Sequence, residues 1–152
     1  DRFDKIIETC LILDIEKKIT NEELFDIVAA QLAGRLNKEK TYLSKKLLER
    51  EEDTSTVLTE NLAIPHLIIE GEGQFDILPV RCEEGILFSE ENPAVQIVFV
   101  IAGTKDQRTF HLQSLAAIAQ IVQDQNFAKK WLKAKNSERL RDVILLGERR
   151  RL

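Results

Sequence analysis

The stretch VQIVFVIA, residues 95–102, is apolar at every position except Gln96. A strand with one face in water alternates apolar and polar residues, whereas a strand covered on both faces is apolar along its whole length. This stretch therefore predicts an interior strand with helices on both sides of its sheet. The neighbouring sequence predicts further strands within residues 54–64 and 75–82.

Helical patterns alternate with these strands. The clearest helix start is Thr20-Asn21-Glu22-Glu23, where threonine and glutamate have the spacing of a capping box, and the apolar periodicity continues to about Leu36. The pattern predicts further helices at residues 41–51, 109–122, 126–134 and 137–146. A brief helical turn within residues 3–13 leads into a short strand at residues 11–13. This alternation predicts an α/β fold, with a mixed β-sheet flanked by helices on both faces.

The composition is that of one compact domain spanning residues 1–152. No apolar run approaches the roughly 18 residues that a membrane-spanning helix needs. The formal net charge is −4, with 22 basic and 26 acidic residues interspersed, so the chain offers no basic field for nucleic acid. Methionine is absent even at position 1, which indicates a domain taken from a longer protein.

The cysteines give no sign of a metal centre or of a disulfide scaffold. Cys10 and Cys82 are the only two, and they lie far apart in the sequence. Together with the two histidines they match no recurring zinc-ligand spacing. We therefore expect no metal site, and a reduced, intracellular compartment.

The best candidate for chemistry is His66, which closes the run Leu62-Ala63-Ile64-Pro65-His66. Proline fixes its own φ and disfavours helix at the residue before it, so we expect the strand to stop at Pro65 and to present His66 at its end. An imidazole held there would be accessible and firmly oriented. Neutral histidine is nucleophilic and titrates near physiological pH, which suits a group that accepts and passes on another group.

Other polar residues could complete a phosphate-binding pocket around His66. His111 is expected in the first turn of a helix, where free N–H groups favour an anion, and Arg50 lies at the end of another helix. Ser55 and Thr56 offer hydroxyl groups just upstream of His66. The alternative is ordinary: a histidine is more often structural than reactive, and Arg50 stands in a charged run that is typical of solvated surface.

Three pieces of the chain resemble the enzyme IIA domain of the mannitol and fructose type, from the bacterial sugar phosphotransferase system, including its nitrogen-regulatory branch. The pieces are Leu48-Glu49-Arg50-Glu51 followed by Ser55-Thr56, then LAIPH at residues 62–66, then HLQSLAAIAQIV at residues 111–122. The resemblance spans nearly the whole chain. It implies the enzyme IIA mannitol-type fold, with no cofactor and no metal.

The resemblance also implies roles for individual residues. His66 would accept a phosphoryl group from an HPr-type phosphocarrier and pass it to an enzyme IIB-type acceptor, as a relay and not as a hydrolase. His111 would be the second active-site histidine and Arg50 the arginine that stabilises the phosphate. Where family members commonly have glycines before the histidine, this chain has Val57-Leu58-Thr59-Glu60-Asn61, in which Asn61 can adopt the left-handed conformation. We therefore expect Asn61, with Ser55 and Thr56, to bind or support the phosphate.

A second resemblance suggests an alternative function. The ending Leu145-Leu146-Gly147-Glu148-Arg149-Arg150-Arg151 is similar to that of IIA-type domains attached to membrane transporters, such as amino-acid permeases and cation antiporters. The domain would then be a cytoplasmic regulatory module, tethered to the membrane through its parent chain. The three arginines could contact anionic lipid, although a solvated helix end is the commoner outcome.

Overall fold

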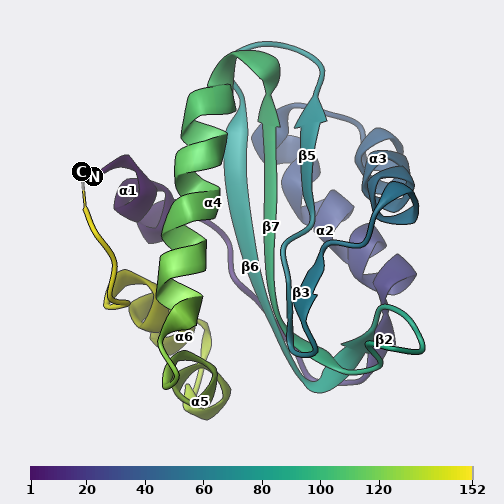
Figure 1. Cartoon of the computed structure of the whole chain (residues 1–152). Coiled ribbons are helices and arrows are strands. Elements are labelled where there is room, and N and C mark those ends of the chain that lie inside the picture. Colours follow the sequence, from purple (N-terminus) through teal and green to yellow (C-terminus); the bar gives the residue numbers. More distant parts are fainter. Residues whose placement is uncertain (152) are drawn as a thin grey trace.

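The computed structural model describes residues 1–151 and contains one mixed β-sheet between two helical layers (Figure 1). The strands are β1 (Leu13–Ile15), β2 (Ile19–Thr20), β3 (Val57–Thr59), β4 (Leu62–Ala63), β5 (His66–Ile69), β6 (Phe75–Leu87) and β7 (Val95–Thr104). The order across the sheet is β1-β6-β7-β4-β3, with β2 also pairing with β6 and β5 with β7. Strands β6 and β7 are antiparallel, while β1 runs parallel to β6, and β4 and β5 run parallel to β7. The predicted α/β fold with a mixed sheet is confirmed.

Strand β7 is buried on both faces, as its apolar sequence predicts. Ile97, Phe99 and Ile101 point into one apolar core, while the alternate residues Val98 and Val100 point into the other. Apolar side chains on both faces of the strand stabilise the fold when they are removed from water. Each face therefore needs a helical layer that covers it.

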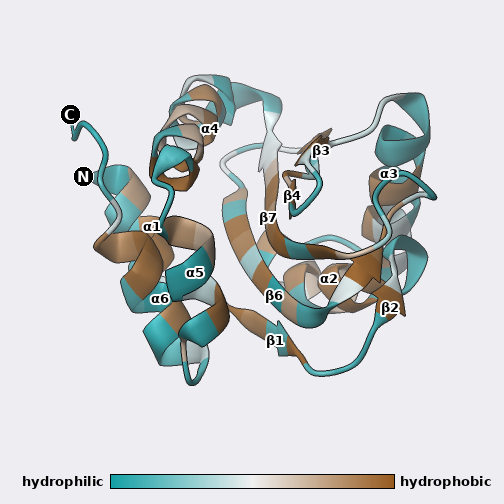
Figure 2. Ribbon diagram, turned by 60° about the horizontal axis from the view of Figure 1, so that its bottom comes forward, coloured by the Kyte–Doolittle hydropathy of each residue, from teal (hydrophilic) through white to brown (hydrophobic). Residues whose placement is uncertain are grey.

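Four helices cover one face of the sheet and two cover the other. The helices are α1 (Arg2–Thr9), α2 (Asn21–Leu36), α3 (Lys40–Asp53), α4 (Arg108–Gln123), α5 (Phe127–Lys133) and α6 (Ser137–Leu145), with a 3-10 turn, η1 (Lys105–Gln107), before α4. Helices α2 and α3 pack on the core that contains Val98, and α1, α4, α5 and α6 on the core that contains Phe99. Figure 2 shows the brown, apolar sides of α2 and α4 turned toward the sheet.

The helix boundaries follow the sequence signals closely. At α2 the Thr20 hydroxyl accepts from the Glu23 backbone N–H at 3.2 Å, and the Glu23 carboxylate accepts from the Thr20 N–H at 3.0 Å. This confirms the capping box. At the N-terminus the prediction was wrong in two respects: α1 is a full helix and not a brief turn, and β1 begins at Leu13, two residues later than expected.

The strand containing LAIPH does not end at Pro65, contrary to expectation. β4 stops at Ala63, but the Pro65 carbonyl accepts a hydrogen bond from the Ile101 N–H at 2.9 Å, and pairing with β7 resumes in β5. Proline lacks only the N–H group, so its carbonyl still holds the chain beside β7. His66 therefore opens a strand.

Residues 54–64 form a short hairpin and not a continuous strand. β3 pairs antiparallel with β4, and the turn between them contains Asn61. The carbonyl oxygen of Asn61 accepts from the Ile97 N–H at 3.0 Å and its side-chain oxygen from the Gln96 N–H at 3.1 Å. Among residues 1–151, Asn37 is the only non-glycine residue with positive φ, so Asn61 does not use the left-handed conformation.

The two chain ends lie side by side (Figure 1) and are joined by ion pairs. The Arg149 guanidinium, with its side chain 3% exposed, lies 2.8 Å from the Asp1 carboxylate and 3.0 Å from that of Asp4. Arg151 also reaches Asp4, at 3.1 Å. The expectation of a solvated helix end was wrong for Arg149, because α1 supplies carboxylates that the sequence spacing could not reveal. Among residues 1–151, no helix combines the length and apolarity needed to cross a bilayer.

Arg81 of β6 links the sheet to the helical layer. Its guanidinium donates to the Asp14 carboxylate, with Nη2 to Oδ2 at 2.6 Å, and to the carbonyl oxygens of Trp131 and Ala134 at the end of α5. The side chain is 7% exposed. It therefore neutralises a carboxylate and satisfies buried helix-end carbonyls at the same time.

We predict that Arg81→Ala lowers the free energy of unfolding by about 3 kcal/mol, because it leaves these acceptors without a donor. Urea denaturation of the variant and the wild type measures the difference. Arg139→Ala is the control, since the Arg139–Asp142 pair is exposed and should contribute under about 0.5 kcal/mol. Equal small losses in both variants would contradict this structural role for Arg81.

Candidate functional site

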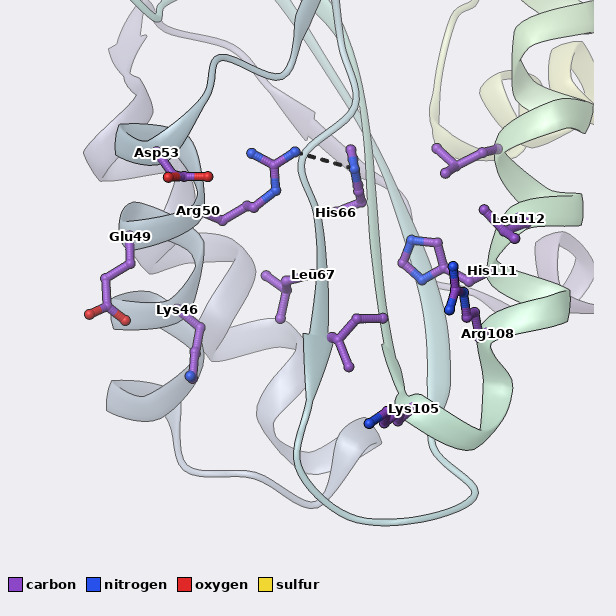
Figure 3. Close-up of a pocket in the computed structure, with 12 residues that line it drawn as sticks. Lys46, Glu49, Arg50, Asp53, His66, Leu67, Lys105, Arg108, His111 and Leu112 are labelled. Carbon is purple, nitrogen blue, oxygen red and sulfur yellow. Dashed lines mark hydrogen bonds between the residues drawn. The ribbon is translucent and has the colours of Figure 1, made fainter.

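A cavity of about 840 Å³ lies between α3 and α4, beside strand β5 (Figure 3). Its lining residues come from α3, β5, η1 and α4. The lining residues are Lys46, Glu49, Arg50, Asp53, His66, Leu67, Ile68, Lys105, Arg108, His111, Leu112 and Leu115. Three predicted site residues, His66, His111 and Arg50, thus meet in one cavity.

The His66 ring is fixed by a hydrogen bond to its own backbone. Its Nδ1 lies 2.7 Å from the carbonyl oxygen of Ile64. A carbonyl oxygen only accepts, so Nδ1 carries the proton and Nε2 of the neutral ring has the free lone pair. The residues around Pro65 therefore set both the orientation of the imidazole and its tautomer.

Arg50 lies next to that lone pair. It belongs to the last turn of α3, where its Nη1 donates to the Thr54 carbonyl at 2.9 Å. Its Nη2 lies 3.4 Å from Nε2 of His66. One end of the guanidinium is thus anchored to the helix end, while the other faces the nitrogen that would carry an added group.

His111 approaches from the opposite wall. It lies in the first turn of α4, as predicted, and its ring centroid is 5.8 Å from that of His66 with the planes at 74°. The side chain is buried, and burial, followed by the nearby His66, lowers the pKa of His111 below its ordinary value. The ring is therefore neutral at pH 7, and serves as a hydrogen-bonding group without a full charge.

The hydroxyl and amide residues predicted to support a phosphate are not among those that line the cavity. The Thr56 hydroxyl is buried and donates to the Glu51 carboxylate at 2.5 Å, while Ser55 Oγ accepts from the Val57 N–H. Asn61 is bound to β7 as described above. These contacts stabilise the segment before His66. The three residues themselves lie outside the lining of the cavity.

The cavity is also lined by three cationic residues that were not predicted as site residues: Lys46, Lys105 and Arg108. Helical spacing could have found two of them, because Lys46 precedes Arg50 by four residues and Arg108 precedes His111 by three. With Arg50 they outnumber the two lining carboxylates, Glu49 and Asp53. The cavity is locally favourable to an anion although the whole chain is acidic.

The geometry suits group transfer through nitrogen. A neutral imidazole can attack an electrophile through the lone pair that here accepts from Arg50, and the guanidinium and a second imidazole are placed to bind oxygens of the transferred group. Within residues 1–151, no cluster of three or more His, Cys, Asp or Glu side chains could hold a metal ion.

Comparisons with known proteins agree on one family. Residues 7–146 match the family described as "Phosphoenolpyruvate-dependent sugar phosphotransferase system, EIIA 2". The mannitol-specific phosphotransferase enzyme IIA component of Bacillus subtilis is 32% identical over 119 residues, which are 74% of this chain and 80% of that protein. The fructose-specific EIIABC component of the same species is 29% identical over 135 residues, which are 87% of this chain but 21% of the relative.

Solved structures show the same fold. Nitrogen regulatory protein IIA-Ntr from Neisseria meningitidis superposes with a TM-score of 0.82 at 20% identity, covering 95% of this chain and 99% of that one. The mannitol enzyme IIA of Escherichia coli, solved in complex with phosphorylated enzyme IIB, gives a TM-score of 0.67 at 21% identity, covering 88% and 92%. The chain belongs to the EIIA 2 family of the phosphoenolpyruvate-dependent sugar phosphotransferase system.

Proposed function

We propose that this domain is a phosphoryl carrier that holds the phosphoryl group on Nε2 of His66. The observation that supports this most directly is the orientation of the ring, with Nδ1 bonded to the Ile64 carbonyl and Nε2 beside Arg50 in the cavity. The donor would be the phosphohistidine of an HPr-type phosphocarrier, and the acceptor an enzyme IIB-type protein.

The transfer step forms one bond and breaks another. The Nε2 lone pair of His66 attacks phosphorus, the donor's N–P bond breaks, and its electron pair returns to the donor's imidazole nitrogen. Arg50 and His111 stabilise the phosphoryl oxygens in the transition state. The His66 ring keeps its Nδ1 proton, so it gains positive charge, which the hydrogen bond to the Ile64 carbonyl stabilises.

Passing the group on reverses these events. The acceptor's nucleophile attacks the same phosphorus and the N–P bond to His66 breaks, which returns the lone pair to Nε2. The positively charged ring is a good leaving group because it departs as a neutral imidazole. No metal is required, because positioning and charge stabilisation account for most of phosphoryl-transfer catalysis.

The rim of the cavity suits contact with protein partners. Ile68 of β5 and Leu112 of α4 are 50% and 54% exposed, and both line the cavity. Exposed apolar side chains beside a reactive group are typical of an interaction surface. The related mannitol enzyme IIA was solved with phosphorylated enzyme IIB. We expect the domain to act in the cytoplasm, alone or within a longer transport protein.

The first prediction concerns His66 itself. Incubation with phosphoenolpyruvate, enzyme I and HPr should add one acid-labile phosphoryl group to the wild type and none to His66→Ala, which lacks the acceptor nitrogen. Intact-mass analysis measures both. His111→Ala is the matched control, because it removes an imidazole from the same cavity and should still become labelled. A phosphoryl group on His66→Ala would refute the assignment of His66 as the acceptor.

Arg50 and His111 should affect the rate and not the capacity for labelling. We predict that Arg50→Ala and His111→Ala each slow phosphoryl transfer by about 100-fold, the effect of removing one donor to transition-state oxygens. Rapid-quench kinetics with phosphorylated HPr measures the rate. Arg139→Ala, which removes an exposed arginine on α6, should leave the rate unchanged. Wild-type rates in both cavity variants would contradict the proposed site.

Burial of His111 should also make stability depend on pH. Because the pKa of His111 is lowered in the folded state from its ordinary value of 6.5, the unfolded chain binds a proton that the folded chain resists. This contribution leaves stability unaffected above about pH 6.5 and reduces it as the pH falls. Urea denaturation from pH 7.5 to 5 should show the wild type losing stability relative to His111→Gln. Parallel curves would contradict this prediction.

A further inference from the structure

Two buried polar atoms on α4 have no hydrogen-bond partner among residues 1–151: Nδ1 of His111 and Oγ of Ser114. His111 is 5% exposed and Ser114 is fully buried. Buried polar atoms in folded proteins almost always have a partner, so two such atoms close together in one helix call for an explanation.

The two residues are neighbours on the helix surface. They are three positions apart, which places them on the same side of α4. Helical side chains lean toward the N-terminus, so the Ser114 hydroxyl leans back over the turn that contains His111. The two atoms do not bond each other in this structure, so the contact requires a rotation about the Cα–Cβ bond of Ser114, which moves the hydroxyl oxygen itself.

The neutral state of His111 makes its tautomer important. Burial lowers the pKa of this ring, so it holds one N–H and one lone pair at pH 7. Nδ1 is the buried nitrogen, which leaves Nε2 as the nitrogen available to the cavity. Nε2 can donate to a phosphoryl oxygen only if it carries the proton, and Nδ1 then needs a donor of its own.

We infer that Ser114 is a positioning residue: its hydroxyl donates to Nδ1 of His111 and holds the ring in the tautomer that presents Nε2–H to the cavity. The functional part of this inference rests on the proposed phosphoryl transfer. The two histidines then have opposite tautomers, each set by a group outside the cavity. The Ile64 carbonyl leaves His66 with a nucleophilic Nε2, and Ser114 leaves His111 with a donating Nε2.

The test is ring ¹⁵N NMR of the unphosphorylated domain at pH 8. The sequence contains only two histidines, so a His66→Gln spectrum assigns the signals of His111. A fixed tautomer gives two well-separated nitrogen shifts, and exchange between tautomers moves them together. Ser114→Ala should bring the His111 shifts together, and Ser114→Thr, which keeps the hydroxyl, should keep them apart. Ile118→Val is the control, since it removes buried volume from the same helix without removing a polar group.

The kinetic readout follows the same variants. Ser114→Ala should lower the rate of transfer within the complex about fivefold, the usual effect of one neutral hydrogen bond, with little change in KM for phosphorylated HPr. Ser114→Thr should restore the rate. Should Ser114→Ala fail to fold, Ser114→Thr and Ser114→Val differ only in the hydroxyl group at equal shape and give the same comparison.

Unchanged ¹⁵N shifts of His111 in the variants without a hydroxyl would overturn the inference, whatever the kinetics. Shifts that move with an unchanged transfer rate would overturn the catalytic role of the contact. The NMR result does not need a phosphoryl donor. If no donor phosphorylates the wild-type domain, the proposed function is refuted. The NMR result still decides separately whether Ser114 bonds to His111.

Discussion

Burial of β7 on both faces is the constraint on which the rest of the structure depends. Its alternating side chains enter two separate apolar cores, so the fold needs a helical layer on each side of the sheet. Because β5 pairs with β7 in parallel, its first residue, His66, lies between α3 of one layer and α4 of the other. A guanidinium and an imidazole can then approach the same ring from opposite walls. The site is thus a consequence of how the two layers close over the sheet.

The sequence predicted the features that depend on regular spacing. Continuous apolarity identified β7, and the capping box identified the start of α2. The helical periodicity correctly placed His111 in the first turn of α4 and Arg50 in the last turn of α3. It failed where long-range hydrogen bonds decide. Pro65 interrupts a strand locally, yet the Ile101 N–H keeps the chain on β7, and no local rule shows that partner.

The supporting polar residues could not be predicted for the same reason. A threonine or asparagine near a reactive histidine looks available for a ligand, whereas Thr56 bonds to Glu51 and Asn61 to β7. Arg149 looked solvated because its carboxylate partners, Asp1 and Asp4, lie at the other end of the chain. Each of these side chains satisfies a group that would otherwise lose its hydrogen bonds on burial. Of these side chains, Thr56 and Asn61 stabilise the segment that leads to His66.

The regulatory alternative, a IIA-type module attached to a permease or antiporter, remains a prediction, and it would use the same cavity. Phosphorylation of His66 would bring about two negative charges on the phosphoryl group, partly offset by the positive ring, to a cavity in which Lys46, Arg50, Lys105 and Arg108 outnumber the carboxylates. That change offsets the net positive charge beside Ile68 and Leu112, the two exposed apolar residues of the rim. A partner that docks there would distinguish the two states by charge, whether it removes the phosphoryl group or only responds to it. Relay and sensor therefore share the chemistry of His66 and differ in the protein that binds the rim.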